Sequence, residues 1–307
     1  MSRHFYPSVL VIFGFIAMGS AQERIDPLIL SVRTDLVTLT VTVVDRRGTP
    51  VTGLRQEHFS VYDNGDRQAI QFFTSEDVAA TIGLVVDSSG SMRGRREEMA
   101  AVASGFAAIR QPLGEFFAIR FNEMVWPQLP PQTAFTDDPN QLRSPLIAAP
   151  REGMTALYDA VDRGLEHLQH GTRDRKVLIV VSDGGDNASR QKLDAVLDRA
   201  RRAEAVIYAV TMFDPDNRDA RPQVLKALAR ETGGRVFVVE STAEITGAFA
   251  QMAHEIRSGY TIGFAPPETV EGGFRSIRVA VDGGPDRRLV ARTRAGYHAR
   301  PSVDTGK

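Results

Sequence analysis

Residues 81–92 read Thr81-Ile82-Gly83-Leu84-Val85-Val86-Asp87-Ser88-Ser89-Gly90-Ser91-Met92, an apolar run that ends abruptly in small polar residues. An apolar run of this length, followed by turn residues, is typical of a strand that is buried on both faces of a parallel sheet. The polar residues then follow the carboxyl end of that strand, where open α/β sheets bind their ligands. The stretch therefore predicts an α/β fold with a site at this edge of the sheet.

Asp87, Ser89 and Ser91 occupy alternate positions, with Gly90 between the two serines. In a tight loop, one carboxylate and two hydroxyls can converge on a single point. Oxygen ligands of this kind suit a hard cation such as Mg²⁺. Taken one at a time, these residues are as easily explained as a helix N-cap and turn residues.

Two further stretches carry polar residues beside predicted elements. The first is the loop around Gly153 and Thr155, which precedes an amphipathic helix over 157–168. The second is Asp183, which follows the apolar run 177–181. Because that run also predicts a buried parallel strand, its polar end belongs at the same edge of the sheet.

The three stretches together resemble the metal-ion-dependent adhesion site of von Willebrand factor type A domains, in the family's order and over roughly residues 79–258. The resemblance implies a doubly wound, mainly parallel, Rossmann-like sheet. It also implies that the serines and the threonine approach the metal directly, while the aspartates balance its charge, directly or through water. The metal-site residues that match the family are Asp87, Ser89, Ser91, Thr155 and Asp183.

The implied cofactor is Mg²⁺, with Mn²⁺ or Ca²⁺ as the other candidates. Neutral hydroxyl ligands leave such an ion underneutralised, so an open coordination position would attract a carboxylate from another molecule. We therefore expect a protein ligand that presents an acidic side chain, with Gly153, Asp186 and Arg93 near it. The alternative is a structural or assembly protein whose metal mainly stabilises the fold, and a solvated surface explains Arg93 equally well.

Enzymatic chemistries fit the sequence poorly. A haloacid dehalogenase-type phosphatase needs a second aspartate where Ser89 stands, and the chain has neither a phosphate loop nor a nucleophile elbow. The six histidines show no zinc-ligand spacing, and a solvated helix face is the interpretation of His167 and His170. We expect no enzyme activity.

Composition and the N-terminal segment limit the classes of partner and the cellular compartments that we expect. The net charge of −1 gives no reason to expect nucleic acid as a partner, and the absence of cysteine excludes disulfides and a cysteine-linked lipid anchor. Residues 1–21 have the charged, apolar and small-residue regions of a secretory signal peptide, with an uncleaved anchor as the alternative. No other stretch could cross a membrane, so we expect an exported bacterial protein, periplasmic or secreted.

The flanking segments carry β patterns. Strict alternation over residues 33–45 and Asn64-Gly65 between strand-like runs predict an antiparallel unit over 26–78, which is too short to bury a core alone. The tail 259–298 has matching patterns, with its last strand over 289–293. We expect the two segments to form one β-sandwich, with two separate appendages as the alternative, and residues 299–307 to be a disordered tail.

Overall fold

The computed structural model describes residues 36–92, 94–109, 112–147, 153–212, 220–267, 272–283 and 288–299. All of these belong to one compact unit, residues 35–307. The predicted signal peptide lies outside the described residues, and so does the predicted tail apart from Ala299, which ends the last strand.

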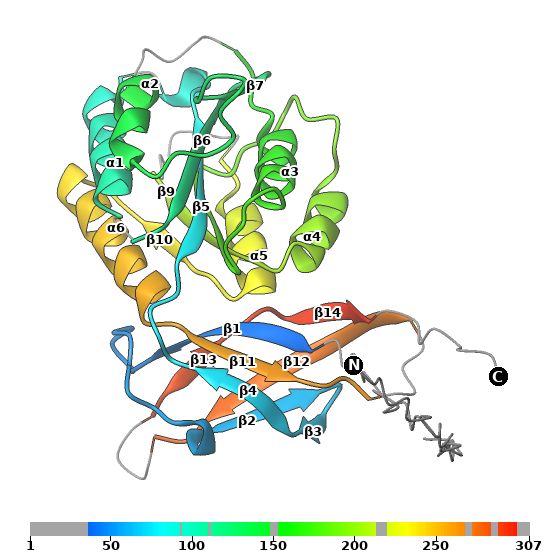
Figure 1. Ribbon diagram of the computed structural model, residues 1–307. Helices are drawn as coiled ribbons and strands as arrows, with labels where there is room; N and C mark the ends of the chain where they lie inside the picture. The colour runs from blue at the N-terminus through cyan, green and yellow to red at the C-terminus, as the bar shows by residue number, and fades with distance from the viewer. Residues whose placement is uncertain are drawn as a thin grey trace, which may run out of the picture. The chain divides into compact units, whose positions relative to one another are not determined.

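A six-stranded sheet forms the centre of the α/β part, with the order β10-β9-β8-β5-β6-β7 (Figure 1). All neighbours are parallel except β6 and β7. This arrangement confirms the predicted doubly wound, mainly parallel fold. The strands are β5 (Ala80–Asp87), β6 (Glu115–Phe121), β7 (Val125–Pro127), β8 (Arg175–Val181), β9 (Ala205–Thr211) and β10 (Val236–Val238).

Helices cover both faces of this sheet, and each face has its own apolar core. The first core joins the sheet to α1 (Arg96–Ala108), the short α2 (Arg143–Ile147) with the 3-10 turn η3 (Pro139–Leu142), and α6 (Thr242–Arg257). The second core joins the sheet to α3 (Leu157–Leu168), α4 (Leu193–Arg202) and α5 (Pro222–Thr232). Figure 1 shows α1 and α6 on one side of the strands and α3, α4 and α5 on the other. The central strands β5, β8 and β9 are consequently apolar along almost their whole length.

Local signals explain where several helices begin and end. Ser241 caps α6 by accepting a hydrogen bond from the Glu244 backbone N–H at 3.3 Å. Gly233 ends α5 in the left-handed conformation, with φ +81°. A Cβ there would lie 2.4 Å from the backbone carbon of Thr293, so only glycine fits this turn.

The flanking segments form two four-stranded antiparallel sheets, with the orders β13-β1-β11-β4 and β14-β12-β2-β3. The expected antiparallel unit is thus seen in part. Strands from both sides of the α/β part pair directly, since β1 pairs with β11 and β12 pairs with β2. The strands are β1 (Val37–Val44), β2 (Phe59–Asp63), β3 (Asp66–Gln68), β4 (Ile70–Thr74), β11 (Tyr260–Phe264), β12 (Gly273–Val281), β13 (Val290–Arg292) and β14 (Gly296–Ala299). The 3-10 turn η1 (Gln56–His58) precedes β2.

One apolar cluster joins the two antiparallel sheets. Leu39 and Val41 of β1, Val61 of β2 and Ile262 of β11 are all fully buried in it. Neither flanking segment supplies this cluster alone, because its members come from both. This agrees with the expectation that a segment of about 50 residues cannot bury a sufficient core.

The hairpin at Asn64-Gly65 is present, but its return strand differs from the prediction. Asn64 and Gly65 have φ values of 50° and 94°, as a two-residue hairpin turn requires, and β2 pairs with β3 beyond them. The following strand, β4, leaves this sheet and pairs with β11 of the other. Phe73 of β4 there packs against Phe59 and Tyr260, with ring centroids 5.4 and 5.9 Å apart.

Two further details correct the sequence interpretation. Thr42 of β1 was expected to face solvent but is only 4% exposed, and it interacts with the buried Tyr208 of β9. The alternation of residues along β1 gives no sign that the α/β part covers the outer face of this strand. In addition, the chain forms one more strand, β14, after the predicted last strand.

Across the part of the chain that the structure describes, none of the helices combines the length and the apolar composition that crossing a bilayer requires.

Candidate functional site

Two aspartates mark the carboxyl ends of neighbouring strands. Asp87 ends β5, and Asp183 lies two residues beyond the end of β8. Both are buried, with exposed fractions of 0% and 7%. The Asp87 carboxylate accepts hydrogen bonds from the Ser89 backbone N–H at 2.9 Å and from Ser182 Oγ at 2.9 Å. The structure thus brings the first and third predicted loops together.

The electrostatics of Asp87 are unfavourable for its charged form. Burial, together with the nearby negative charge of Asp183, raises its pKa from 3.8 to about 6. Hydrogen bonds from Ser89 and Ser182 act in the opposite direction. A cation beside the two carboxylates would relieve both the desolvation and the repulsion.

The Thr155 loop is tied to both neighbours through its backbone. Gly90 N–H donates to the Gly153 carbonyl at 3.4 Å, which joins the first loop to the second. The Thr155 carbonyl accepts from the N–H groups of Asn187 and Ala188 at 2.9 and 3.0 Å, and its own N–H donates to Asn187 Oδ1 at 2.8 Å. These bonds join the second loop to the third.

Gly184 allows the sharp turn that follows Asp183. Its φ is +86°, and a Cβ at this position would lie 2.3 Å from the backbone oxygen of Arg221. The Asp183 carbonyl accepts from Arg221 N–H at 3.1 Å, while its carboxylate accepts from Gly185 N–H at 2.8 Å. The turn therefore fixes the Asp183 carboxylate at the edge of the sheet.

The structure describes some of the remaining predicted site residues fully, one by its backbone alone and one not at all. Ser89 is buried, with 1% exposed, and Thr155 is half-buried. Ser91 lies in the 3-10 turn η2 (Gly90–Met92), but its side chain is outside the description, and Arg93 is outside the described residues altogether. No group of three or more His, Asp or Glu side chains in the described ranges could hold a metal by itself. The oxygen donors that the structure describes at this edge of the sheet are the carboxylates of Asp87 and Asp183 and the hydroxyls of Ser89 and Thr155.

Asp186 has a structural role that sequence reasoning did not predict. Its Oδ1 accepts from Tyr158 N–H at 3.2 Å and from Ser189 Oγ at 2.5 Å, and Ser189 Oγ accepts from Asp159 N–H at 3.1 Å. Asp186 and Ser189 therefore cap α3 from a distant loop, since the N-cap residue Ala156 has no side-chain acceptor.

Asp159 is likewise more than a helix surface residue. Its carboxylate accepts from the backbone N–H groups of Arg190 and Gln191, at 3.0 and 2.9 Å. Asp159 thus lies on the helix surface, partly exposed, and has a structural contact in addition. Asp159 anchors the loop that carries Asp186.

Asn122 and Glu123 were missed by the sequence analysis. They follow β6, the strand next to β5. The Asn122 carbonyl accepts from Ala156 N–H at 2.7 Å, and Glu123 Oε2 accepts from Met154 N–H at 2.9 Å. A Cβ on Gly153 would come within 2.3 Å of the same Glu123 oxygen. The two residues thus hold the chain on both sides of Thr155, and their only sequence signal is two polar residues after an apolar strand.

Arg120 is a third missed residue, and it supports the first loop. Its Nε donates to Ser88 Oγ at 2.9 Å, and its Nη1 donates to the Pro145 carbonyl at 3.2 Å. Ser88 stands between Asp87 and Ser89. A single arginine inside the apolar run of β6 could have indicated this role.

His167 also departs from its sequence interpretation. Its Nε2 lies 2.7 Å from the Ala134 carbonyl, and its ring packs against Phe117 and Phe135, with centroids 4.3 and 4.9 Å apart. Burial lowers the pKa of His167, although the bond to Ala134 acts in the opposite direction. The prediction that His167 lies on a solvated helix face is therefore wrong. His167 instead joins α3 to the loop that carries Ala134 and Phe135.

The chain is similar in fold to a solved structure. A search of curated proteins found no match. Among solved structures, von Willebrand factor type A from Catenulispora acidiphila is 12% identical with a TM-score of 0.52, covering 89% of this chain and 76% of that one. An aerotolerance-related membrane protein from Bacteroides fragilis is 15% identical with a TM-score of 0.46, covering 58% and 99%. The vWF domain of the type V pili tip protein Mfa5 from Porphyromonas gingivalis is 12% identical with a TM-score of 0.46, covering 59% and 95%.

At these identities the structural likeness shows the fold alone. The sequence model of the von Willebrand factor type A domain matches residues 81–251, which is more than half of the chain and includes all three loops described above. The chain therefore belongs to the von Willebrand factor type A domain family.

Proposed function

We propose that this protein binds a protein ligand through a divalent metal ion held at the carboxyl edge of its parallel sheet. The observation that carries the proposal is the pair of buried carboxylates, Asp87 and Asp183, on adjoining loops. Two negative charges in a desolvated position repel each other, and a cation bound beside them would relieve this repulsion. The proposed role is binding, and it requires no catalytic residue.

Mg²⁺ is the proposed ion, because the available donors are carboxylate and hydroxyl oxygens. Asp87 and Asp183 would supply the negative charge, and the hydroxyls of Ser89, Ser91 and Thr155 would be the remaining ligands that the protein provides to the ion. Mn²⁺ and Ca²⁺ prefer similar oxygen donors and are the other candidates. The bound ion would supply a positive charge at the protein surface.

The proposed partner is a protein that presents an Asp or Glu side chain to this ion. Because its directly bound hydroxyl ligands would be neutral, the ion would gain from a carboxylate of another molecule at an open coordination position. The net charge of −1 gives no global attraction for acidic partners, so the attraction would depend on the ion. The proposed setting is outside the cytoplasm, because residues 1–21 have the pattern of a signal peptide.

A mainly structural role for the metal is the second candidate, and the hydrogen bonds argue against it. The three loops are already joined by the Gly90–Gly153 bond and by the bonds between Thr155 and the residues at 187–188. An ion is thus not required as their sole link. The two roles predict different results when the metal is removed from a folded protein. Partner binding is lost if the ion contacts the partner, and it is kept if the ion only stabilises the fold.

The first experiment is a calorimetric titration of the purified protein with Mg²⁺, together with melting curves in Mg²⁺, Mn²⁺ and chelator. At a free metal concentration of 100 times the dissociation constant, linkage gives about 2.7 kcal/mol of stabilisation. For a protein of this size this corresponds to roughly 5–10 °C in Tm. Ser89→Ala and Asp183→Ala should lose this response.

The matched control is Asp137→Ala. Asp137 is exposed and follows Thr136, which bridges to Phe116 at the start of β6, the end of the sheet remote from the site. This variant should respond to Mg²⁺ as the wild type does. Identical wild-type melting curves in Mg²⁺, Mn²⁺ and chelator would refute the metal site. A metal response without any metal-dependent partner, tested with Mg²⁺ and with chelator on the same extract, would favour the structural role.

A further inference from the structure

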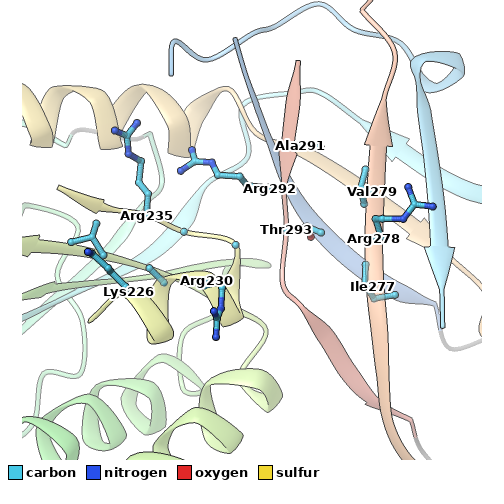
Figure 2. Close-up of a pocket in the computed structure, with 13 residues that line it drawn as sticks. Lys226, Arg230, Arg235, Ile277, Arg278, Val279, Ala291, Arg292 and Thr293 are labelled. Carbon is cyan, nitrogen blue, oxygen red and sulfur yellow. The ribbon is translucent and has the colours of Figure 1, made fainter. Parts of the chain in front are cut away.

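A basic cavity lies at the edge of the sheet opposite the candidate metal site. Its volume is about 530 Å³, and it lies between the end of α5, the turn before β10, and strands β12 and β13 (Figure 2). The cationic residues that line it are Lys226, Arg230, Arg235, Arg278 and Arg292, and no Asp or Glu is part of the lining. The cavity is therefore strongly positive in a chain whose net charge is −1.

Arg235 and Arg292 carry more positive charge than their shared partner neutralises. Both contact the buried carboxylate of Glu255, at 3.3 and 2.5 Å. One carboxylate thus serves two guanidinium groups. Arg235 is also held over the Phe237 ring, with 4.4 Å to the centroid, so its position is fixed by packing and charge together.

Lys226 and Arg230 add positive charge from the last turns of α5, where both are exposed. Arg230 lies 3.6 Å from Glu231, but that carboxylate also accepts from Arg201 at 3.0 Å. Arg278 is different, because its guanidinium lies over the Tyr62 ring, 3.8 Å from the centroid. Four cations therefore line the cavity beside two carboxylates, because Arg235 and Arg292 share Glu255 and Arg230 shares Glu231 with Arg201.

We infer that this cavity binds a phosphate or sulfate group, in a ligand with at least two such charges. Three of the four cations are arginines, whose planar guanidinium groups suit oxyanions with several oxygens. They come from two walls: Figure 2 shows Lys226, Arg230 and Arg235 on the α5 and β10 side, and Arg292 on β13. A ligand with one charge could not neutralise both walls. The volume lies within the range of small-molecule sites.

The test is a calorimetric titration of the protein with inorganic pyrophosphate, and separately with a disulfated disaccharide. Divalent metal is removed beforehand, because pyrophosphate itself binds Mg²⁺. We expect saturable binding at 0.15 M salt that weakens about tenfold or more at 0.5 M, since the attraction is electrostatic. The tighter of the two probes identifies the source of the oxyanion, whereas a single inorganic phosphate should bind more weakly than either.

The double variant Lys226→Ala/Arg230→Ala should weaken binding of the tighter probe about tenfold. Both residues are exposed, so this variant should melt like the wild type. Arg202→Ala is the matched control, because Arg202 is an exposed arginine in the last turn of the neighbouring helix α4. No binding of either probe at 0.15 M salt, or equal affinity in the double variant and the wild type, would overturn the proposal. The result is independent of the metal site, which is empty of metal throughout this titration.

Discussion

The Asp87 carboxylate and the Ser182 hydroxyl are joined by a hydrogen bond of 2.9 Å, which links the ends of β5 and β8. Ser182 Oγ also accepts from Gly184 N–H at 3.1 Å, so the bond connects Asp87 to the turn that carries Asp183. Whatever charge Asp87 carries is therefore felt by both loops. This relationship gives the first prediction.

Asp87→Asn should stabilise the metal-free protein at pH 7. The folded pKa of Asp87 is about 6, above its ordinary value of 3.8. Between these pH values the folded protein binds more protons than the unfolded chain, so stability falls as pH rises through the window. The ionised carboxylate then costs about 1–3 kcal/mol at neutral pH. The asparagine substitution removes this cost and keeps an oxygen for the Ser89 bond.

Urea unfolding in chelator at pH 4.5 and pH 7 measures this effect. The wild type should be more stable at the lower pH relative to Asp87→Asn, so the difference between the two proteins should shrink as pH falls. The same variant should lose the Mg²⁺ response. If Asp87→Asn is less stable than the wild type at pH 7 in chelator, the ionised Asp87 carboxylate does not carry the expected free-energy cost.

Glu123→Ala should weaken Mg²⁺ binding although Glu123 is not among the proposed ligands. The substitution removes the acceptor of Met154 N–H and loosens the chain on one side of Thr155. Loss of a residue that orients a ligand typically costs about 10–100-fold in metal affinity. Glu123→Gln keeps an oxygen acceptor and should retain most of the affinity. Calorimetric titration of both variants decides the matter, and equal losses in both would show that charge, not positioning, is responsible.

Asp186→Ala should lower stability while leaving the metal response in place. The carboxylate caps α3 by accepting from Tyr158 N–H and Ser189 Oγ. Loss of a capping side chain costs about 1 kcal/mol. Melting curves with and without Mg²⁺ should both shift downward by a similar amount. Asp194→Ala is the control, since Asp194 is exposed in the first turn of α4. Loss of the Mg²⁺ shift itself would place Asp186 in the metal site.

Glu255→Ala should be destabilising, by about 1.5–3 kcal/mol, because it removes a buried carboxylate and leaves two half-buried guanidinium groups without their counter-charge. Glu255 is only 1% exposed and contacts Arg235 and Arg292. Glu166→Ala offers the comparison, since its ion pair with Arg163 is about half exposed. An exposed pair contributes only about 0–1 kcal/mol. Urea unfolding of the two variants should therefore give clearly different midpoints, and similar midpoints would contradict this account of Glu255.

The sequence allowed the sheet and the loops of the site to be predicted because their signals are local. The runs that became β5 and β8 are almost entirely apolar, and polar residues directly follow each of them. Strand order then brings those ends together, since β5 and β8 are parallel neighbours. Asp87 and Asp183 meet for this reason alone.

What could not be predicted depends on contacts between distant segments. The role of Glu123 arises only because the loop at 153–156 lies against the end of β6. The capping role of Asp186 requires a loop 28 residues away in the chain to reach the first turn of α3. Similarly, nothing in the residues of β4 indicates that it pairs with β11 rather than with β2 or β3. Residue patterns report the faces of an element and not its partner.

The pairing of β4 with β11 also determines how mechanical force passes through the molecule. The chain leaves β4 for the α/β part and returns in β11, and Thr74 pairs with Thr261 at this junction. Tension applied between β1 and β14 would be carried by strand pairs of the antiparallel sheets and would bypass the α/β part entirely. Tension applied by a partner gripping the metal-site edge would instead reach these sheets through two adjacent strands. Because both strands join the α/β part at the same end of their pair, such tension would pull β4 and β11 in the same direction and would not separate them from each other.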